Sequence, residues 1–112
     1  MFVENSYLHR KQFADHGEYL ELEIWVGLGA KSDGHSFEDW SGFHGFPRQL
    51  LARLEKGVFF ALNENKFSNL KVALVECRWL DVDSPEWLFE EVATVCVREA
   101  LQKLEVKRDK AD

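Results

Sequence analysis

Positions 19–28 read YLELEIWVGL, a stretch in which two kinds of side chain alternate. One alternating set is wholly aliphatic and comprises Leu20, Leu22, Ile24, Val26 and Leu28. The other set holds Tyr19, Glu21, Glu23 and Trp25. Because successive side chains of a β-strand point to opposite faces, this pattern predicts a strand with one buried and one open face.

Other elements are predicted on both sides of this strand. In chain order we expect a strand over about 4–13, a short strand near 36–40, a helix over 47–63 and a strand over 70–79. A last helix follows Ser84, the expected N-cap, and extends to about Leu104. Gly57 lies inside the first helix, where we expect it to allow another backbone to approach closely.

This order of elements predicts an α+β fold, a two-layer α/β sandwich. About four mixed strands form the sheet, and two helices cover one of its faces. The strand over 70–79 is apolar on both faces, which is typical of a central strand. We expect one domain over residues 1–106 and a frayed polar tail over 107–112.

The composition limits the classes of function. The chain has 112 residues, is 46% apolar and has a formal net charge of −6. An acidic balance disfavours nucleic-acid binding, which usually depends on a surplus of Lys and Arg. The N-terminus lacks the apolar segment of a secretory signal, and no apolar run reaches the roughly 18 residues of a membrane span, so we expect a cytoplasmic protein.

No cofactor or metal is expected. Cys77 and Cys96 lie far apart in the sequence and are interpreted as separate buried thiols. The four histidines, His9, His16, His35 and His44, lack metal-ligand spacing and are expected at the surface. An acidic cluster, Asp81, Asp83 and Glu86, is open to two interpretations, a divalent-metal site or the acidic start of a helix, and we favour the second.

Three segments resemble domain IV of the translation elongation factor G and elongation factor 2 family. They are HRKQ at 9–12 before the Tyr19 strand, PRQ at 47–49 with LEKGV at 54–58, and KVAL at 71–74 with DVDSPE at 81–86 and REA at 98–100. The resemblance covers about Leu8 to Leu101. It implies the family's fold, including a left-handed βαβ crossover, for a stand-alone domain without the GTPase.

The chain departs from the family at the two tip loops, which in elongation factor G contact tRNA and mRNA. Residues 13–18, FADHGE, have fewer glycines and more acid than the family's first loop. In the second loop, Leu80 stands where the family has a histidine. These departures weaken the expectation of RNA contact.

The residues that we single out for partner or RNA contact are His9, Arg10, Lys11, His16, Tyr19, Trp25, Arg78, Trp79 and Asp81. The basic cluster at 9–11 is either a weak RNA contact or a solvated strand. Trp25 is either an anchor for a partner or packs against neighbouring strands or the loop over 29–45.

Two functional hypotheses follow. The first is a non-catalytic interaction module that binds a protein partner, or a second copy, through the open sheet face. The alternative is a ribosome- or RNA-associated protein that binds at or near the elongation factor site. An enzyme is not expected, because the sequence lacks a phosphate-binding loop, a nucleophile–base pair and a metal motif.

Overall fold

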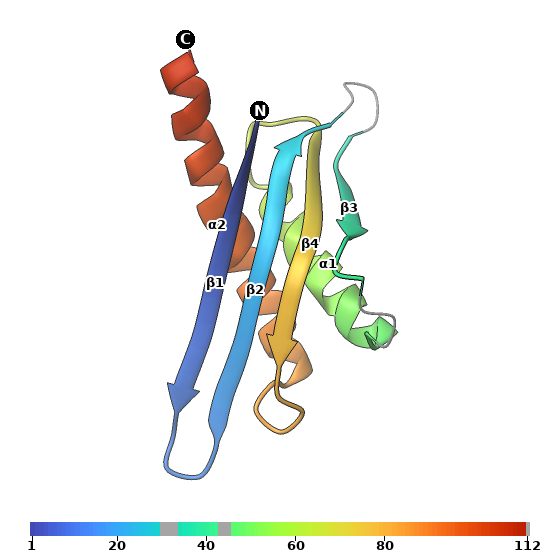
Figure 1. Cartoon of the computed structure of the whole chain (residues 1–112), viewed down its shortest axis with the longest axis vertical. Helices are drawn as coiled ribbons and strands as arrows, with labels where there is room; N and C mark the ends of the chain where they lie inside the picture. Colours follow the sequence, from blue (N-terminus) through green and yellow to red (C-terminus); the bar gives the residue numbers. More distant parts are fainter. Residues whose placement is uncertain (30–33, 43–45, 112) are drawn as a thin grey trace.

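The computed structural model describes residues 1–29, 34–42 and 46–111. Its elements are β1 (Phe2–Gln12), β2 (Gly17–Leu28), β3 (Ser36–Asp39), α1 (Arg48–Leu62), β4 (Leu70–Trp79) and α2 (Glu86–Ala111). The four strands form one sheet in the order β1-β2-β4-β3, and both helices lie behind it in Figure 1. The predicted fold class and the central position of β4 are confirmed.

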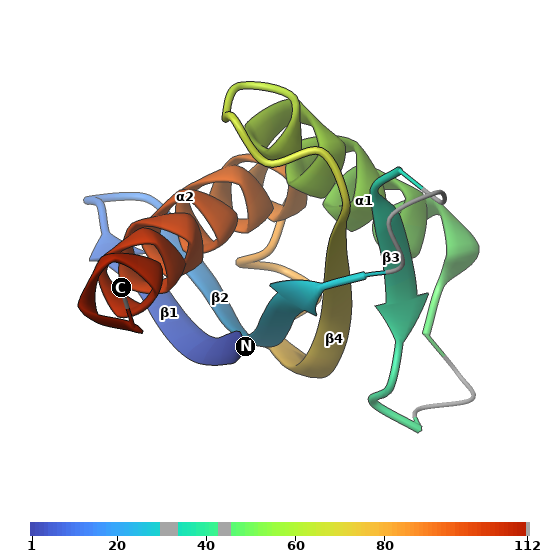
Figure 2. The ribbon, with the colours of Figure 1, turned by 90° about the horizontal axis from the view of Figure 1, so that it is seen from above.

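The sheet is mixed, and its one parallel connection has an unusual hand. Strand β2 is antiparallel to β1 and β4, whereas β3 is parallel to β4. In Figure 1 both parallel strands point downward, β3 lies to the right of β4 and α1 lies behind them; Figure 2 shows the helices on that same side. The β3–α1–β4 crossover is therefore left-handed, against the general rule.

The alternation in β2 separates the two faces of the sheet as predicted. Ile24 is only 2% exposed beneath the helices, and Leu20, Leu22 and Val26 are buried with it. Trp25 lies on the opposite face, paired in register with Glu4 of β1 and Ala73 of β4. The core lies between the sheet and the helices, since removing aliphatic side chains from water drives this packing.

The two helices cross at Gly57. A Cβ atom built on this residue would lie 2.2 Å from the carbonyl oxygen of Glu90 in α2. Thr94 adds a hydrogen bond at the same crossing, donating from Oγ1 to the Gly57 carbonyl over 3.2 Å. The close backbone approach that we expected at this glycine is confirmed.

Two features of α2 correct the predictions. The helix continues to Ala111 rather than ending near Leu104, so residues 107–111 are helical and not a frayed tail. Glu, Lys, Arg and Ala are good helix formers, and basic residues suit the negative end of the helix dipole. Ser84 also differs from its expected role as N-cap, because its hydroxyl binds the Leu80 N–H and the Tyr19 carbonyl.

Both cysteines are free thiols, as predicted. Burial raises the pKa of each thiol to about 12. The structure describes three of the four histidines, since His44 lies outside the described residues. His16 is exposed as expected, His35 is half-buried and accepts a hydrogen bond from the Leu70 N–H, and His9 is buried, which contradicts the surface prediction. Within the described ranges, neither helix is long and apolar enough to cross a membrane.

Candidate functional site

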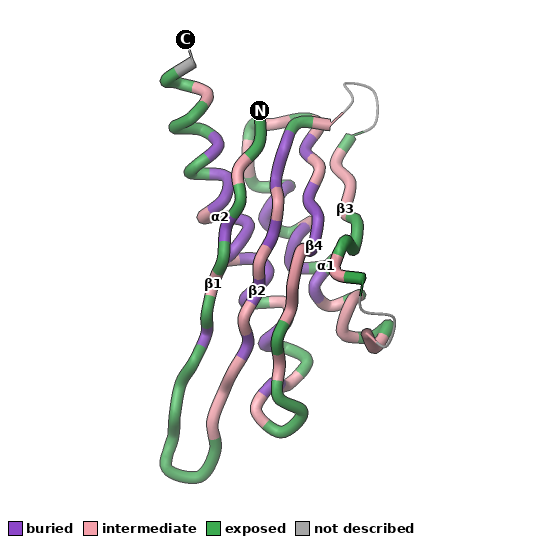
Figure 3. Tube along the Cα trace, viewed as in Figure 1, coloured by how far each residue is buried: buried purple, intermediate pink, exposed green. Residues whose placement is uncertain are grey.

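The predicted contact residues fall mainly into two regions of the surface. We call the first region the tip; it comprises the end of the β1–β2 hairpin (residues 9–19) and the β4–α2 loop (residues 80–85). The second region is the aromatic patch, formed by Phe2, Trp25 and Trp40. Figure 3 shows the hairpin end of the tip as a largely exposed loop at the bottom of the molecule.

Backbone contacts join the two loops of the tip. The Tyr19 N–H donates to the carbonyl of Asp83 over 2.8 Å, and the Ser84 hydroxyl donates to the carbonyl of Tyr19. These two bonds hold the β4–α2 loop against the base of the hairpin. Segments that are separate in the sequence therefore form one surface.

Two carboxylates at the tip contact histidines of the same region. Nε2 of His9 lies 2.9 Å from Oε1 of Glu18, and the two side chains are only 9% and 12% exposed. His9 is buried because β1 pairs with β2 in a register that turns its side chain toward Leu20 and the helix-covered side. At the surface, Nδ1 of His16 lies 2.7 Å from Oδ1 of Asp15.

The expected basic cluster is thus divided between the interior and the surface. His9 is inside, whereas Arg10 and Lys11 are exposed. A hollow of about 530 Å³ lies beside the contact between the two loops of the tip, lined by residues of both the hairpin and the β4–α2 loop. Lys11 and Asp83 are among its lining residues. Because the hollow presents both signs of charge, it is not a strongly basic surface of the kind that phosphate contacts require.

Arg78 and Asp81 lie near the same end of the sheet. The Arg78 guanidinium binds Glu21 at 3.3 Å and Glu76 at 2.9 Å across the open face. Asp81 is exposed in the β4–α2 loop. Within the described residues, no group of three or more His, Cys, Asp or Glu side chains is arranged to hold a metal ion.

The aromatic patch lies on the helix-free face of the sheet. The Trp25 ring stacks on Phe2 with 5.5 Å between ring centroids and contacts Trp40 at 5.2 Å. The ring also covers Gly27, where an added Cβ would lie 2.4 Å from it. Trp25 therefore packs against its neighbours, yet Phe2 and Trp40 remain 45% and 46% exposed, so the patch still offers aromatic surface to solvent.

Polar contacts fix one rim of this patch. The Trp40 indole N–H donates to Glu38 over 2.8 Å, and Nζ of Lys71 lies 3.3 Å from the same carboxylate and 5.4 Å from the Trp40 ring centroid. The hydrogen bond from Trp40, followed by that from Lys71, lowers the pKa of Glu38. The rim thus presents one positive and one negative side chain beside the rings.

Sequence reasoning missed Phe2 and Trp40. The register of β1 on β2 places Phe2 opposite Gly27 and beside Trp25, and the sequence pattern of β1 does not contain that register. Trp40 has no such signal, because it follows a short strand whose partner is set by the crossover. Trp79 differs from Trp25: it pairs with Leu20 on the helix-covered face, is half-buried and packs against Phe46 and Phe89.

These observations define a two-layer α/β domain with one open sheet face. No protein-family model matches the sequence. The chain is, however, 29% identical over 110 residues to elongation factor G of Ruegeria sp. (strain TM1040) and of Dinoroseobacter shibae (strain DSM 16493 / NCIMB 14021 / DFL 12). Each alignment covers 94% of this chain and 16% of the relative.

A solved structure shows the same fold. A protein of Thermus thermophilus superposes with a TM-score of 0.77 at 17% identity, over 91% of this chain and 16% of that one. The chain is therefore similar in sequence, over nearly its whole length, to a domain-sized part of elongation factor G. Because it spans only about 16% of the relatives' length, their overall activity does not transfer with the similarity.

Proposed function

We propose that this chain is a non-catalytic protein-interaction module that binds a second copy of itself through the aromatic patch. The supporting observation is the group of three contacting rings on the helix-free face of the sheet. Exposed aromatic surface of this kind commonly marks protein–protein contacts, in which Trp side chains contribute a large share of the binding energy.

A two-fold contact suits the rim of the patch. In a symmetric dimer the same surface faces itself, so each side chain on the rim approaches the rim of the other copy. Lys71 and Glu38 already form an ion pair beside Trp40, so this rim carries no excess of one sign of charge. A rim with only one sign of charge would repel its own copy.

The test measures molecular mass in solution over a range of concentrations. We expect the wild type to dimerise at micromolar concentrations and Trp40→Glu to remain monomeric. Trp40 is preferred to Trp25 for this substitution because Trp25 also packs over Gly27 and supports the sheet. The matched control is Val82→Glu, which places the same charge at a 93% exposed position of the tip.

The controls decide the outcome. Dimers in the wild type and in Val82→Glu, but not in Trp40→Glu, support the proposal. A wild-type monomer at high micromolar concentration, or a dimer that Trp40→Glu leaves intact, rejects self-association through this patch. Circular dichroism of all three proteins checks that the fold is retained.

The second candidate is a ribosome- or RNA-associated, translation-related protein. The observation in its favour is the similarity to elongation factor G, which extends over 94% of this chain. The tip would make the contact, and such a role would place the chain in the cytoplasm. The net charge of −6 and the mixture of both signs of charge at the tip oppose it.

Co-sedimentation with ribosomes at low and high salt tests this candidate. If the tip binds ribosomal RNA, the chain pellets at low salt and is released as salt rises, because phosphate contacts weaken with ionic strength. Replacing Arg10 and Lys11 with Gln should then reduce pelleting. Failure to pellet at low salt eliminates the candidate.

A further inference from the structure

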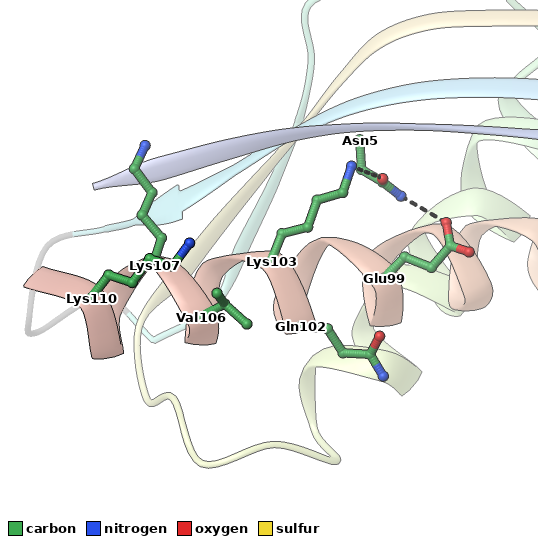
Figure 4. Close-up of a pocket in the computed structure, with 7 residues that line it drawn as sticks. All are labelled: Asn5, Glu99, Gln102, Lys103, Val106, Lys107 and Lys110. Atoms are coloured by element: carbon green, nitrogen blue, oxygen red, sulfur yellow. Dashed lines mark hydrogen bonds between the residues drawn. The ribbon is translucent and has the colours of Figure 1, made fainter.

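A groove of about 700 Å³ lies between β1 and the C-terminal half of α2. We call it the lysine groove, after Lys103, Lys107 and Lys110 of α2. Figure 4 shows these side chains along the helix, with Asn5 of β1 above Lys103. Three lysines in one groove are unexpected in a chain whose net charge is −6.

The ammonium groups of this groove lack acidic partners. Nζ of Lys103 donates to Oδ1 of Asn5 over 2.6 Å, and Nζ of Lys107 donates to the carbonyl of Phe2 over 2.9 Å. Both acceptors are neutral. No ion pair joins any of the three lysines to a carboxylate of the described residues, whereas Lys71 and Arg98 are paired with glutamates.

One carboxylate lines the groove at its inner end. Oε1 of Glu99 accepts a hydrogen bond from the Asn5 side-chain amide over 3.1 Å. Asn5 is only 4% exposed and bridges this carboxylate to Lys103, so it links strand and helix at the base of the groove. Beyond it the groove carries the positive charges of Lys107 and Lys110.

The other wall of the groove is a sheet edge. Strand β1 is the outermost strand on its side, so one row of its backbone groups has no neighbouring strand within the described sheet. The Phe2 carbonyl belongs to that outer row, because it accepts its hydrogen bond from Lys107 of α2 rather than from β2. An exposed edge of this kind can pair with an added extended segment.

We propose that the lysine groove binds an extended peptide segment rich in acidic and aliphatic residues, which adds to the sheet beside β1. Acidic side chains of the segment would pair with Lys107 and Lys110, while aliphatic ones would contact Val106, which is 54% exposed. Backbone pairing gives affinity and alternate side chains give specificity in this mode of recognition.

A peptide fits this site better than a nucleic acid. Phosphate binding draws on a wider basic surface than three lysines in an acidic protein. Base stacking would also need an aromatic ring, and none of the described residues that line the groove is aromatic. None of the residues that line the groove belongs to the aromatic patch, although Lys107 contacts Phe2 of that patch.

The experiment uses the full chain and a fluorescein-labelled peptide of four Glu-Val repeats. Fluorescence anisotropy at low salt measures binding, and amide chemical shifts show where the peptide lies. We expect saturable binding that weakens with added salt and shifts concentrated in β1 and in α2 beyond Glu99. The double variant Lys107→Glu/Lys110→Glu should weaken binding by about tenfold or more, since two attractive contacts become repulsive.

A matched control separates the groove from net charge. Lys11→Glu/Arg48→Glu makes the same change in total charge at exposed positions away from the groove, and we expect its affinity to change by less than about threefold. A Lys-Val peptide of equal length should bind poorly to the wild type and better to Lys107→Glu/Lys110→Glu. An unfolded variant would not gain affinity for the Lys-Val peptide, so this result would not be explained by a loss of folding.

Several outcomes overturn the proposal. One is an absence of binding by the Glu-Val peptide at submillimolar concentrations. Another is an equal loss of peptide affinity in Lys107→Glu/Lys110→Glu and in its control, Lys11→Glu/Arg48→Glu. The third is tighter binding of a labelled oligouridylate than of the peptide, which would assign the groove to RNA. Because the wild-type dimer and this binding are measured separately, each proposal can fail without the other.

Discussion

The aromatic patch and the tip occupy opposite ends of one β-hairpin. Phe2 pairs with Gly27 at one end, and Gln12 pairs with Gly17 at the other. At the tip, two carboxylates contact histidines of the same region, as Glu18 does with His9. In the patch, aromatic rings find partners too, but each outer ring keeps almost half of its surface exposed.

The difference shows how two kinds of contact affect a later binding step. A polar group that already has a hydrogen-bond partner gains little from a further polar partner, since the first contact must be broken. Apolar contact is non-directional and grows with the area removed from water, so a ring that stacks on one side can still bind on the other. The patch is thus better suited to a new partner than the tip.

The largest expected effect comes from removing the central ring of the patch. Trp25→Ala deletes the contacts with Phe2 and Trp40 and uncovers Gly27, so we expect unfolding to become easier by about 2 kcal/mol. Tyr19→Ala, on the same strand and face but at the tip, should cost about 1 kcal/mol or less, since its hydroxyl bonds Glu21 at the surface. Urea denaturation measures the free energy of unfolding of both variants. Equal losses of stability would contradict the difference that we describe between the patch and the tip.

An intermediate effect is expected where Ser84 connects the two loops of the tip. Ser84→Ala removes the hydroxyl that links Leu80 and Tyr19, and we expect a loss of about 1–2 kcal/mol. Hydrogen exchange should show faster exchange at the Leu80 amide, with the amides of the patch unchanged. Ser68→Ala is the control, because its hydroxyl makes only an exposed contact of 3.5 Å with Asn69. Faster exchange throughout the sheet would contradict a purely local role for the Ser84 hydroxyl.

The smallest effect concerns acid pH at the rim of the patch. Because hydrogen bonds from Trp40 and Lys71 lower the pKa of Glu38 below its ordinary value of 4.5, its stabilising contribution is present above pH 4.5. That contribution is lost as pH falls through the lowered pKa. The Trp40 indole N–H resonance should move in this acidic range in the wild type but not in Glu38→Gln. A resonance that titrates identically in both proteins would exclude Glu38 as the cause.

The spacing of apolar residues along the sequence predicted most of the secondary structure. The alternation from Tyr19 to Val26 predicted which side chains are buried, because each strand residue faces one side or the other. Leu28, predicted on the same face, is 47% exposed at the end of β2. The spacing of the leucines predicted α1 by the same kind of argument. The ends of elements were less well determined, as the extension of α2 to Ala111 shows, since a polar sequence of good helix formers resembles an exposed tail.

The candidate site was only partly foreseen. Trp25 was recognised from its place in an alternating strand, whereas Trp40 was not, because its neighbour across the sheet depends on the β3–α1–β4 crossover. His9 was assigned to the surface because the histidines lack metal-ligand spacing, but pairing with β2 places it beside Glu18. The lysine groove also escaped notice, since its walls are separated by about 100 residues in the sequence, as the 105-residue span between Phe2 and Lys107 shows.

The amino-acid order alone was enough to predict the periodic elements and the buried face of β2, whereas the need for a glycine at position 57 depends on the Glu90 carbonyl of α2. The periodic elements and the buried face follow from geometry within a few neighbouring residues. Which rings touch, which charges are satisfied and which lysines remain without a carboxylate depended on how distant segments were brought together. Such contacts arise from strand order, register and helix crossing, and no short window of residues contains that information.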